Sequence, residues 1–268
     1  MLYLNRSLLP VVLAGLVFLS CHSVPLTGRN QLNIIPSSTM LSMSAQEYNS
    51  FLQSNPKSND QANAALVQNV GQRIQGAVER FMTQEGAADQ LAGYKWEFNL
   101  VQSDQVNAWA MPGGKVVFYT GILPITQNET GIAVVMGHEV AHAIAEHGNE
   151  RMSQGLIAQF GAIALSEALK NKPEQTQALY MTAFGLGAQF GAILPFSRLQ
   201  ESEADHLGLI FMAMAGYDPN AAVAFWERMA ANKGGQAPPE FMSTHPSDQT
   251  RIAKIREALP EAMQYYKP

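Results

Sequence analysis

Apolar residues recur every three or four positions after Asp60, which is the spacing of a single helix face. Asp60 is a preferred N-cap residue, because its carboxylate can accept hydrogen bonds from the first backbone N–H groups of a helix. We therefore expect a long amphipathic helix to begin here, and a shorter helix over residues 42–52. The apolar stripe of the long helix comprises Ala64, Val67, Val70, Ile74, Ala77, Val78 and Phe81.

The pattern changes to an alternation of apolar and polar residues between Tyr94 and Val101, which is typical of a half-buried strand. Two further segments of strand character follow, QVNAWAM and KVVFYTGIL. They are separated by Pro112-Gly113-Gly114, a strong turn sequence. These three segments predict a small antiparallel sheet.

Helical periodicity dominates the chain from Glu129 onward, and its main interruption is the Gly/Pro-rich segment at residues 233–239. The sequence contains no internal repeat and no second domain boundary. We therefore expect one α+β domain over residues 42–268, most of it helical. The clearest helical segments are 129–147, 151–169, 175–194, 199–215, 219–232 and 247–258.

The largely apolar stretch at residues 178–196 permits two interpretations. Gly187 and Gly191 have the spacing that lets two helices approach closely, which favours a helix buried by packing. Contact with the interface of a bilayer is the alternative, because most of the stretch is apolar. Polar residues within it, such as Gln189, disfavour a true membrane-spanning helix.

Composition removes two classes of protein from consideration. Apolar residues make up 47% of the 268 residues and charged residues only 15%, so the chain is not of the disordered type. The net charge of −5 at pH 7 provides no electrostatic attraction for nucleic acid. We therefore expect a folded protein with no nucleic-acid partner.

The single cysteine, Cys21, ends a segment with an apolar run from Leu8 to Leu19. This run is shorter than the ~20 residues of a membrane-spanning helix but suits a signal peptide. The sequence VFLSC resembles the lipobox of bacterial lipoproteins, and an ordinary secretory signal is the alternative. We expect residues 1–20 to be a signal peptide, Cys21 to carry lipid that tethers the chain to a membrane, and residues 21–41 to form an extended tether.

The segment VVMGHEVAHAIAEHG, residues 134–148, places candidate metal ligands in an apolar helix. Each helical residue advances the face by about 100°, so His138 and His142 lie on one face, one turn apart. Zinc hydrolases use such a pair, and the adjacent Glu139 could act as base toward a water that the metal activates. Hydrogen-bonded core histidines are the alternative, but polar residues in so apolar a helix favour metal binding. His147 lies about 180° from His138 on a continuous helix and is not expected to be a ligand.

The third ligand is expected to be a carboxylate on a later helix. The segment RLQESEADHLG, residues 198–208, holds Glu201, Glu203 and Asp205, and periodicity alone does not decide between them. Small residues on the face of Glu201 and Asp205, including Gly208, would let this helix pack closely against another. A solvated acidic turn near a helix start is the alternative, and the histidine pair disfavours it.

The combination of HEVAH and ESEAD resembles the HtpX and CAAX prenyl protease type I family of gluzincins, peptidase family forty-eight. Four further segments support the resemblance: TGRNQL, which is typical of a bacterial lipoprotein branch, NAWAMPGGKVVFYTGIL, GHEVAHAIAEHGNER and STHPSDQTRI. Together they cover most of residues 24–256. The resemblance implies a zincin-like metallopeptidase domain with one zinc ion per chain.

The resemblance also implies roles for individual residues. His138, His142 and Glu201 would bind zinc, and Glu139 would be the general base. Asp205 would orient a ligand histidine through a hydrogen bond. An extended peptide would pair by β-augmentation with an edge strand of the sheet. This strand would comprise Asn107, Ala108, Trp109 and Ala110.

His245 has three candidate roles. In related lipoproteins a histidine at this place can occupy the fourth zinc position and hold the enzyme inactive. It could instead stabilise the oxyanion of the tetrahedral intermediate, or it is merely the residue beside Pro246 at a helix start. We favour self-inhibition as the hypothesis, relieved by movement of residues 233–245.

The resemblance implies a zinc endopeptidase, held by lipid on the periplasmic side of a bacterial envelope, that cleaves misfolded or misassembled envelope proteins. His22 stands where inner-membrane lipoproteins typically have aspartate, which favours the outer membrane. A binding or chaperone module with zinc in a closed shell of four ligands is the rival, although such a site has no need of Glu139. A membrane-embedded prenyl-protein protease is disfavoured by the lack of convincing spans.

Overall fold

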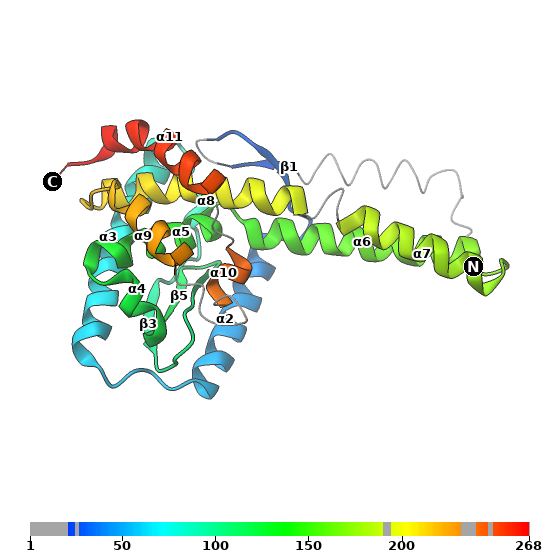
Figure 1. The fold of residues 1–268 in the computed structure, drawn as a ribbon, viewed down its shortest axis with the longest axis horizontal. Helices are drawn as coiled ribbons and strands as arrows, with labels where there is room; N and C mark the ends of the chain where they lie inside the picture. The colour runs from blue at the N-terminus through cyan, green and yellow to red at the C-terminus, as the bar shows by residue number, and fades with distance from the viewer. Residues whose placement is uncertain (1–20, 25–26, 190–193, 232–239, 246–248, 268) are drawn as a thin grey trace.

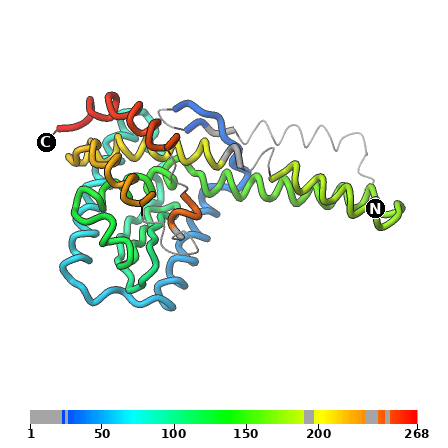
Figure 2. The backbone as a smooth tube through the Cα atoms, in the orientation of Figure 1, coloured from blue at the N-terminus to red at the C-terminus, as the bar shows by residue number. Residues whose placement is uncertain are grey.

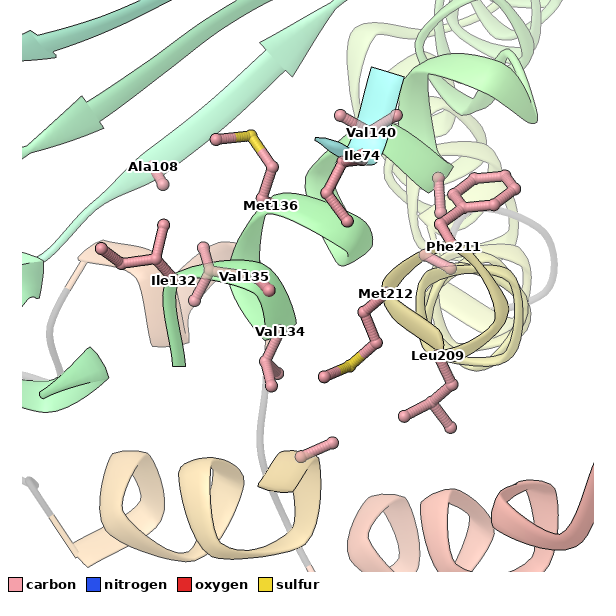
Figure 3. Packing of buried hydrophobic residues seen from close by; sticks show 14 of the residues in the cluster. Ile74, Ala108, Ile132, Val134, Val135, Met136, Val140, Leu209, Phe211 and Met212 are labelled. Carbon is pink, nitrogen blue, oxygen red and sulfur yellow. The ribbon is translucent and has the colours of Figure 1, made fainter. Parts of the chain in front are cut away.

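The core of the protein is built around helix α5 (Glu129–Ile144), in which every residue from Gly131 to Ile144 is buried. A helix that is apolar on all sides must be enclosed by other elements. Helix α8 (Leu194–Met214), helix α3 (Gln61–Gln84), strand β4 (Ala108–Met111) and helix α9 (Ala221–Ala231) enclose it. Figure 3 shows Ile132 and Met136 on the side facing Ala108 of β4, and Leu209 and Met212 contributed by α8.

The computed structural model describes residues 21–24, 27–189, 194–231, 240–245 and 249–267 (Figure 1). The predicted signal peptide lies outside these ranges, as does the Gly/Pro-rich segment at residues 233–239. Within them the protein is mostly helical with a small sheet, which confirms the predicted fold class. The shorter elements are η1 (Ala88–Leu91), η2 (Thr120–Ile122), α4 (Leu123–Thr126) and α10 (Glu240–Thr244), and α11 (Gln249–Tyr265) ends the described chain.

The long amphipathic helix is confirmed as α3. The carboxylate of Asp60 accepts a hydrogen bond from the backbone N–H of Asn63 over 3.0 Å, so this residue is the N-cap as predicted. Most of the predicted apolar stripe is buried against α5, α8 and the sheet. The helix therefore covers one side of the core from which the site is built.

The sheet is mixed, not purely antiparallel as predicted. Its strands are β3 (Glu97–Val101), β5 (Lys115–Tyr119) and β4, in the order β3-β5-β4. The turn at residues 112–114 makes β4 and β5 an antiparallel hairpin, with Gly113 and Gly114 at positive φ. All five residues of β5 are buried, so this strand takes the centre and pairs in parallel with β3. Strand β4 is consequently left at the edge.

Residues 21–41 do not form the extended tether that the sequence suggested. Strand β1 (Cys21–Ser23) pairs antiparallel with β2 (Asn30–Leu32), and helix α2 (Ser37–Ser54) begins earlier than expected. The segment is held on the folded body by polar contacts. Asn149 of helix α6 (His147–Leu169) donates a hydrogen bond to the backbone carbonyl of Ile35, and Arg29 pairs with two acidic residues. Contacts between residues so far apart in the sequence leave no periodic pattern, so the sequence did not predict them.

Helices α6 (His147–Leu169) and α7 (Glu174–Ala188) form a hairpin that projects from the rest of the chain (Figures 1 and 2). No described residue of α7 is buried, so residues 178–188 do not form the buried packing helix that was expected, while Gly191 lies outside the described residues. None of the described helices combines the length and the apolar character needed to cross a membrane. The large apolar side chains exposed on the hairpin are Met152, Ile157, Phe160, Ile163, Leu179, Tyr180 and Leu186.

Helices α5 and α8 approach each other closely where two glycines meet. A Cβ atom added at Gly137 would lie 2.7 Å from the carbonyl oxygen of Gly208, and one added at Gly208 would lie 2.9 Å from the backbone of Gly137. Because backbone atoms cannot turn aside like a flexible side chain, any larger residue would separate the two helices. This contact confirms that small residues let the acidic helix pack closely.

We predict that Gly137→Ala lowers the free energy of unfolding by about 1–3 kcal/mol, because it overpacks the contact between α5 and α8. The matched control is Gly155→Ala in α6, where an added Cβ meets nothing within 4 Å. This control should stabilise the protein by up to about 1 kcal/mol, since alanine is the better helix former. Urea denaturation of both variants measures the difference, and equal stability would contradict the packing argument.

Candidate metal centre

Helix α5 places the two histidines of the HEVAH segment one turn apart, as the spacing predicts. Their Nε2 atoms are 3.1 Å from each other, and both rings are buried. The Nδ1 atoms point away from this meeting point, toward other side chains. His138 and His142 therefore offer one nitrogen each to a shared position.

Helix α8 brings Glu201, and not Glu203, to the histidine pair. Its Oε1 atom is 3.3 Å from Nε2 of His142, and its Oε2 atom is 3.4 Å from Nε2 of His138. Glu203 points instead toward Arg29 and His147. The carboxylate that the family resemblance favoured is thus the one that faces the two rings.

His245, which follows α10 directly, completes the group. Its Nδ1 atom lies 2.9 and 3.0 Å from the two oxygens of Glu201 and 3.1 Å from Nε2 of His138. Taking one donor atom from each of the four residues, all lie within 4.8 Å of one another, and all four residues are buried. Three distant parts of the chain therefore converge on one point.

The chemistry of these donors fits zinc. Zinc prefers imidazole nitrogen and carboxylate oxygen, with three protein ligands in catalytic sites and four in structural ones. Glu139, next to His138 in sequence, is buried beside the group. Its Oε1 atom makes no hydrogen bond with the described residues and lies 3.4 Å from Nε2 of His245. A buried carboxylate oxygen without a hydrogen bond is costly, which indicates a functional reason for its position.

A first set of polar contacts, made by Asp205 and Arg251, supports His138. Oδ1 of Asp205 lies 3.0 Å from Nδ1 of His138, as expected for a residue that orients a ligand. Arg251 of α11 donates two hydrogen bonds of 2.8 Å to Asp205 and approaches Glu201 within 3.3 Å. The Arg251 guanidinium also lies over the ring of Trp226, 3.5 Å from its centroid. Sequence reasoning missed Arg251 and Trp226, and the only signal was the place of Arg251 within the segment STHPSDQTRI.

A second polar contact, made by His147, supports His142. It was not expected, because His147 was predicted to face away. The backbone of Glu146 has a φ of 53°, in the left-handed region. Helix α5 therefore ends before this residue, and α6 starts after it in a new direction. Because the helix is not continuous, His147 does not face away: its Nδ1 atom is 2.7 Å from Nδ1 of His142. Its position is still outside the four-residue group, on the far side of the ring of His142.

Hydrogen bonds and burial oppose each other across the site. Burial alone lowers the pKa of His138, but hydrogen bonds with Asp205 and Glu201 raise it to about 9. Burial alone would raise the pKa of Glu201, but contacts with the histidines hold it far below its usual range. Burial raises the pKa of Glu139 and lowers that of His142. The ionised carboxylates thus stabilise positive charge where the rings meet.

The predicted substrate strand lies at the edge of the sheet, next to this group. Strand β4 starts at Ala108, one residue after the expected Asn107, and pairs only with β5 among the described strands. Helix α10 is attached at the same edge, because the backbone N–H of Phe241 donates a hydrogen bond to the carbonyl of Val106 over 3.2 Å. The segment that carries His245 therefore adjoins the start of the edge strand.

Comparison with known proteins shows that residues 68–259 match peptidase family M48. The chain is 39% identical to the mitochondrial metalloendopeptidase OMA1 of Schizosaccharomyces pombe over 187 residues, 69% of this chain and 53% of that protein. It is 35% identical to OMA1 of Saccharomyces cerevisiae over 189 residues, 66% and 51% of the two chains. It is 31% identical to the beta-barrel assembly-enhancing protease of Escherichia coli over 169 residues, 60% and 34%. The chain thus spans about half the length of the OMA1 relatives from the two yeasts.

These matches contradict the predicted location on the periplasmic side of a bacterial outer membrane. The relatives that share 39%, 35% and 33% identity with the chain are mitochondrial proteins of two yeasts and Arabidopsis thaliana. The predicted location rests on the resemblance to a bacterial lipoprotein branch and on the short segment around Cys21, whereas these three relatives match 69%, 66% and 73% of the chain. Lipidation of Cys21 stays a prediction, since the structure does not describe its side chain.

We predict that Arg251→Met lowers the free energy of unfolding by about 3–5 kcal/mol, because it leaves buried carboxylates without their cation. The control is Arg256→Met on the same helix. Arg256 pairs with Glu227 while both side chains are more than half exposed, so its loss should cost less than about 1 kcal/mol. Chemical denaturation of both variants gives the values, and a similarly small loss at Arg251 would contradict the assigned role.

Proposed function

Because the chain belongs to peptidase family M48, as its sequence predicted, we propose that it is a zinc-dependent endopeptidase. His138, His142 and Glu201 would hold the metal, and Glu139 would be the general base. One observation carries the proposal: four buried donors lie within 4.8 Å of one another, with the Glu139 carboxylate beside them. The metalloendopeptidase names of the relatives support the same activity.

Zinc in this site would act as a Lewis acid and lower the pKa of a water from 15.7 to around 7. The residues of the chain have separate tasks around it. Glu139 accepts the proton of the attacking water and returns it to the leaving amine, and a base with a raised pKa is suited to both steps. Asp205 and Arg251 keep the ring of His138 in one orientation, and burial excludes competing water from the carboxylate of Glu139.

The proposed substrate is an extended segment of a misfolded or misassembled protein. Strand β4 is at the edge of the sheet and contacts α5, so a chain added alongside it would run past the metal site. Binding by β-augmentation uses backbone hydrogen bonds, so it depends only weakly on the side chains of the substrate. Folded proteins present few free extended segments, so this geometry selects unfolded regions over a particular sequence.

His245 is proposed to inhibit the enzyme. Its ring occupies the fourth position of the donor group, close to Glu139, where a water and a substrate carbonyl would have to enter. Helix α10, which carries this histidine, is also bonded at the start of the edge strand. Release of α10 would remove His245 from the metal position and leave the edge strand free to pair with a peptide.

A binding or chaperone module is the second candidate, favoured by the same position of His245. A permanently closed shell of four ligands would make zinc structural. The edge strand could then hold unfolded segments without cutting them. The buried carboxylate of Glu139 argues for the peptidase, because a structural site has no use for it.

We predict that Glu139→Gln reduces cleavage of an unfolded protein substrate by at least about 100-fold, since the base is lost. Bound zinc, measured by atomic absorption, should be unchanged. The matched control is Glu129→Gln on the same helix, whose side chain bonds Arg73 and Tyr217 away from the site. Cleavage by Glu139→Gln at the level of this control would contradict the peptidase proposal.

We predict that His245→Ala increases the rate of cleavage several-fold, because it opens the fourth position. His206→Ala is the control: it also removes an imidazole, but one that is paired with Glu261 near the surface. Initial rates with a quenched fluorescent peptide compare the two variants with the unaltered protein. Equal or lower activity in His245→Ala would count against self-inhibition.

A further inference from the structure

We propose that His147 and Glu203 form a positioning relay for the ligand His142, and that Arg29 of the N-terminal segment locks this relay in place. The inference rests on the proposed zinc site. It assigns a function to residues that the peptidase mechanism does not use. It also explains why a segment far from the active-site helix is attached at this point of the fold.

The relay is a continuous chain of short contacts behind the metal position. Nδ1 of His142 is 2.7 Å from Nδ1 of His147, and Nε2 of His147 is 3.0 Å from Oε2 of Glu203. His147 is completely buried, and Glu203 is 6% exposed. Both groups have little access to bulk water, so each contact constrains the next.

The order of hydrogen-bond donors and acceptors along the relay follows from its last residue, Glu203. Glu203 accepts hydrogen bonds from the Nε–H of Arg29 over 2.9 Å and from the hydroxyl of Thr27, so it is an ionised acceptor. His147 must then donate to it from Nε2, which leaves Nδ1 of a neutral ring as an acceptor. His142 consequently donates from Nδ1 and keeps the lone pair of Nε2 for the metal.

Arg29 holds two buried carboxylates at once. Besides Glu203, its Nη1 and Nη2 atoms contact the two oxygens of Glu150 over 2.8 and 2.9 Å. Glu150 also accepts a hydrogen bond of 2.7 Å from Gln200 and has no contact with His147 among those described. The two acids therefore share the same cation and similar burial, but only Glu203 is connected to the metal ligand.

This difference separates a positioning role from a merely structural one. If Arg29 only attached the N-terminal segment, loss of either acid would have the same consequence. If the relay sets the ring of His142, loss of Glu203 alone should weaken metal binding. The mutation of residues that support a ligand in this way typically costs 10–100-fold in metal affinity.

The test compares zinc dissociation constants of the full chain, measured by competition with a chromophoric chelator. Glu203→Leu should weaken zinc binding by about 10–100-fold, and the matched Glu150→Leu by less than about threefold. Glu203→Gln should restore part of the affinity, because an amide oxygen can still accept from His147. Circular dichroism and thermal unfolding establish that the variants compared are folded to the same extent.

A second measurement needs no variant. Histidine ¹⁵N NMR of the zinc-loaded protein reports which ring nitrogen carries the proton, and the proposal requires Nε2 for His147 and Nδ1 for His142. The opposite tautomer of His147 would overturn the relay.

The outcomes distinguish the two proposals. Absence of zinc from the unaltered protein would overturn the proposed function and the relay with it. Zinc binding that is equal in Glu203→Leu and the unaltered protein would overturn the relay alone. An equal loss in Glu203→Leu and Glu150→Leu would show that Arg29 only attaches the N-terminal segment, which also overturns it.

Discussion

The close contact between α5 and α8 at Gly137 and Gly208 determines the rest of the site. Gly137 directly precedes the first histidine of the donor group, and the backbones approach so closely that a Cβ at either glycine would meet backbone atoms under 3 Å away. At this separation a glutamate on α8 can reach two imidazoles on α5. A wider separation would leave Glu201 too far from His138 and His142 to share one metal ion with them.

Placing so many charges in the interior is stable because most of them are paired; the exception is the carboxylate of Glu139, one oxygen of which makes no hydrogen bond with the described residues. Asp205 and Glu201 lie beside Arg251 on one side of the histidines. Glu203 and Glu150 lie beside Arg29 on the other. An unpaired buried charge would cost several kcal/mol, so the two arginines are as necessary to the site as the acids. One arginine comes from the C-terminal helix and the other from the N-terminal segment, and both ends of the described chain are thereby tied to the centre.

The sequence predicted those features that depend on local spacing. The N-cap at Asp60 follows from the residue type, and the buried face of α3 and the histidine pair follow from periods of three and four residues. What it missed depends on contacts between distant residues or on an irregular backbone conformation. The order of the strands was not evident because β5 pairs with a strand that precedes β4 in the chain. The role of His147 was missed because the left-handed backbone at Glu146 breaks the helix assumed to be continuous. Apolar character alone suggested burial for α7, but among the described elements it packs mainly against α6, and none of its described residues is buried.

We propose that three separate segments of the chain hold one zinc ion. Anomalous X-ray scattering at the zinc absorption edge, from crystals of the zinc-loaded protein, tests it most directly. A single strong peak is expected between Nε2 of His138, Nε2 of His142 and the carboxylate of Glu201. A peak elsewhere, or none at this position in protein saturated with zinc, would contradict it.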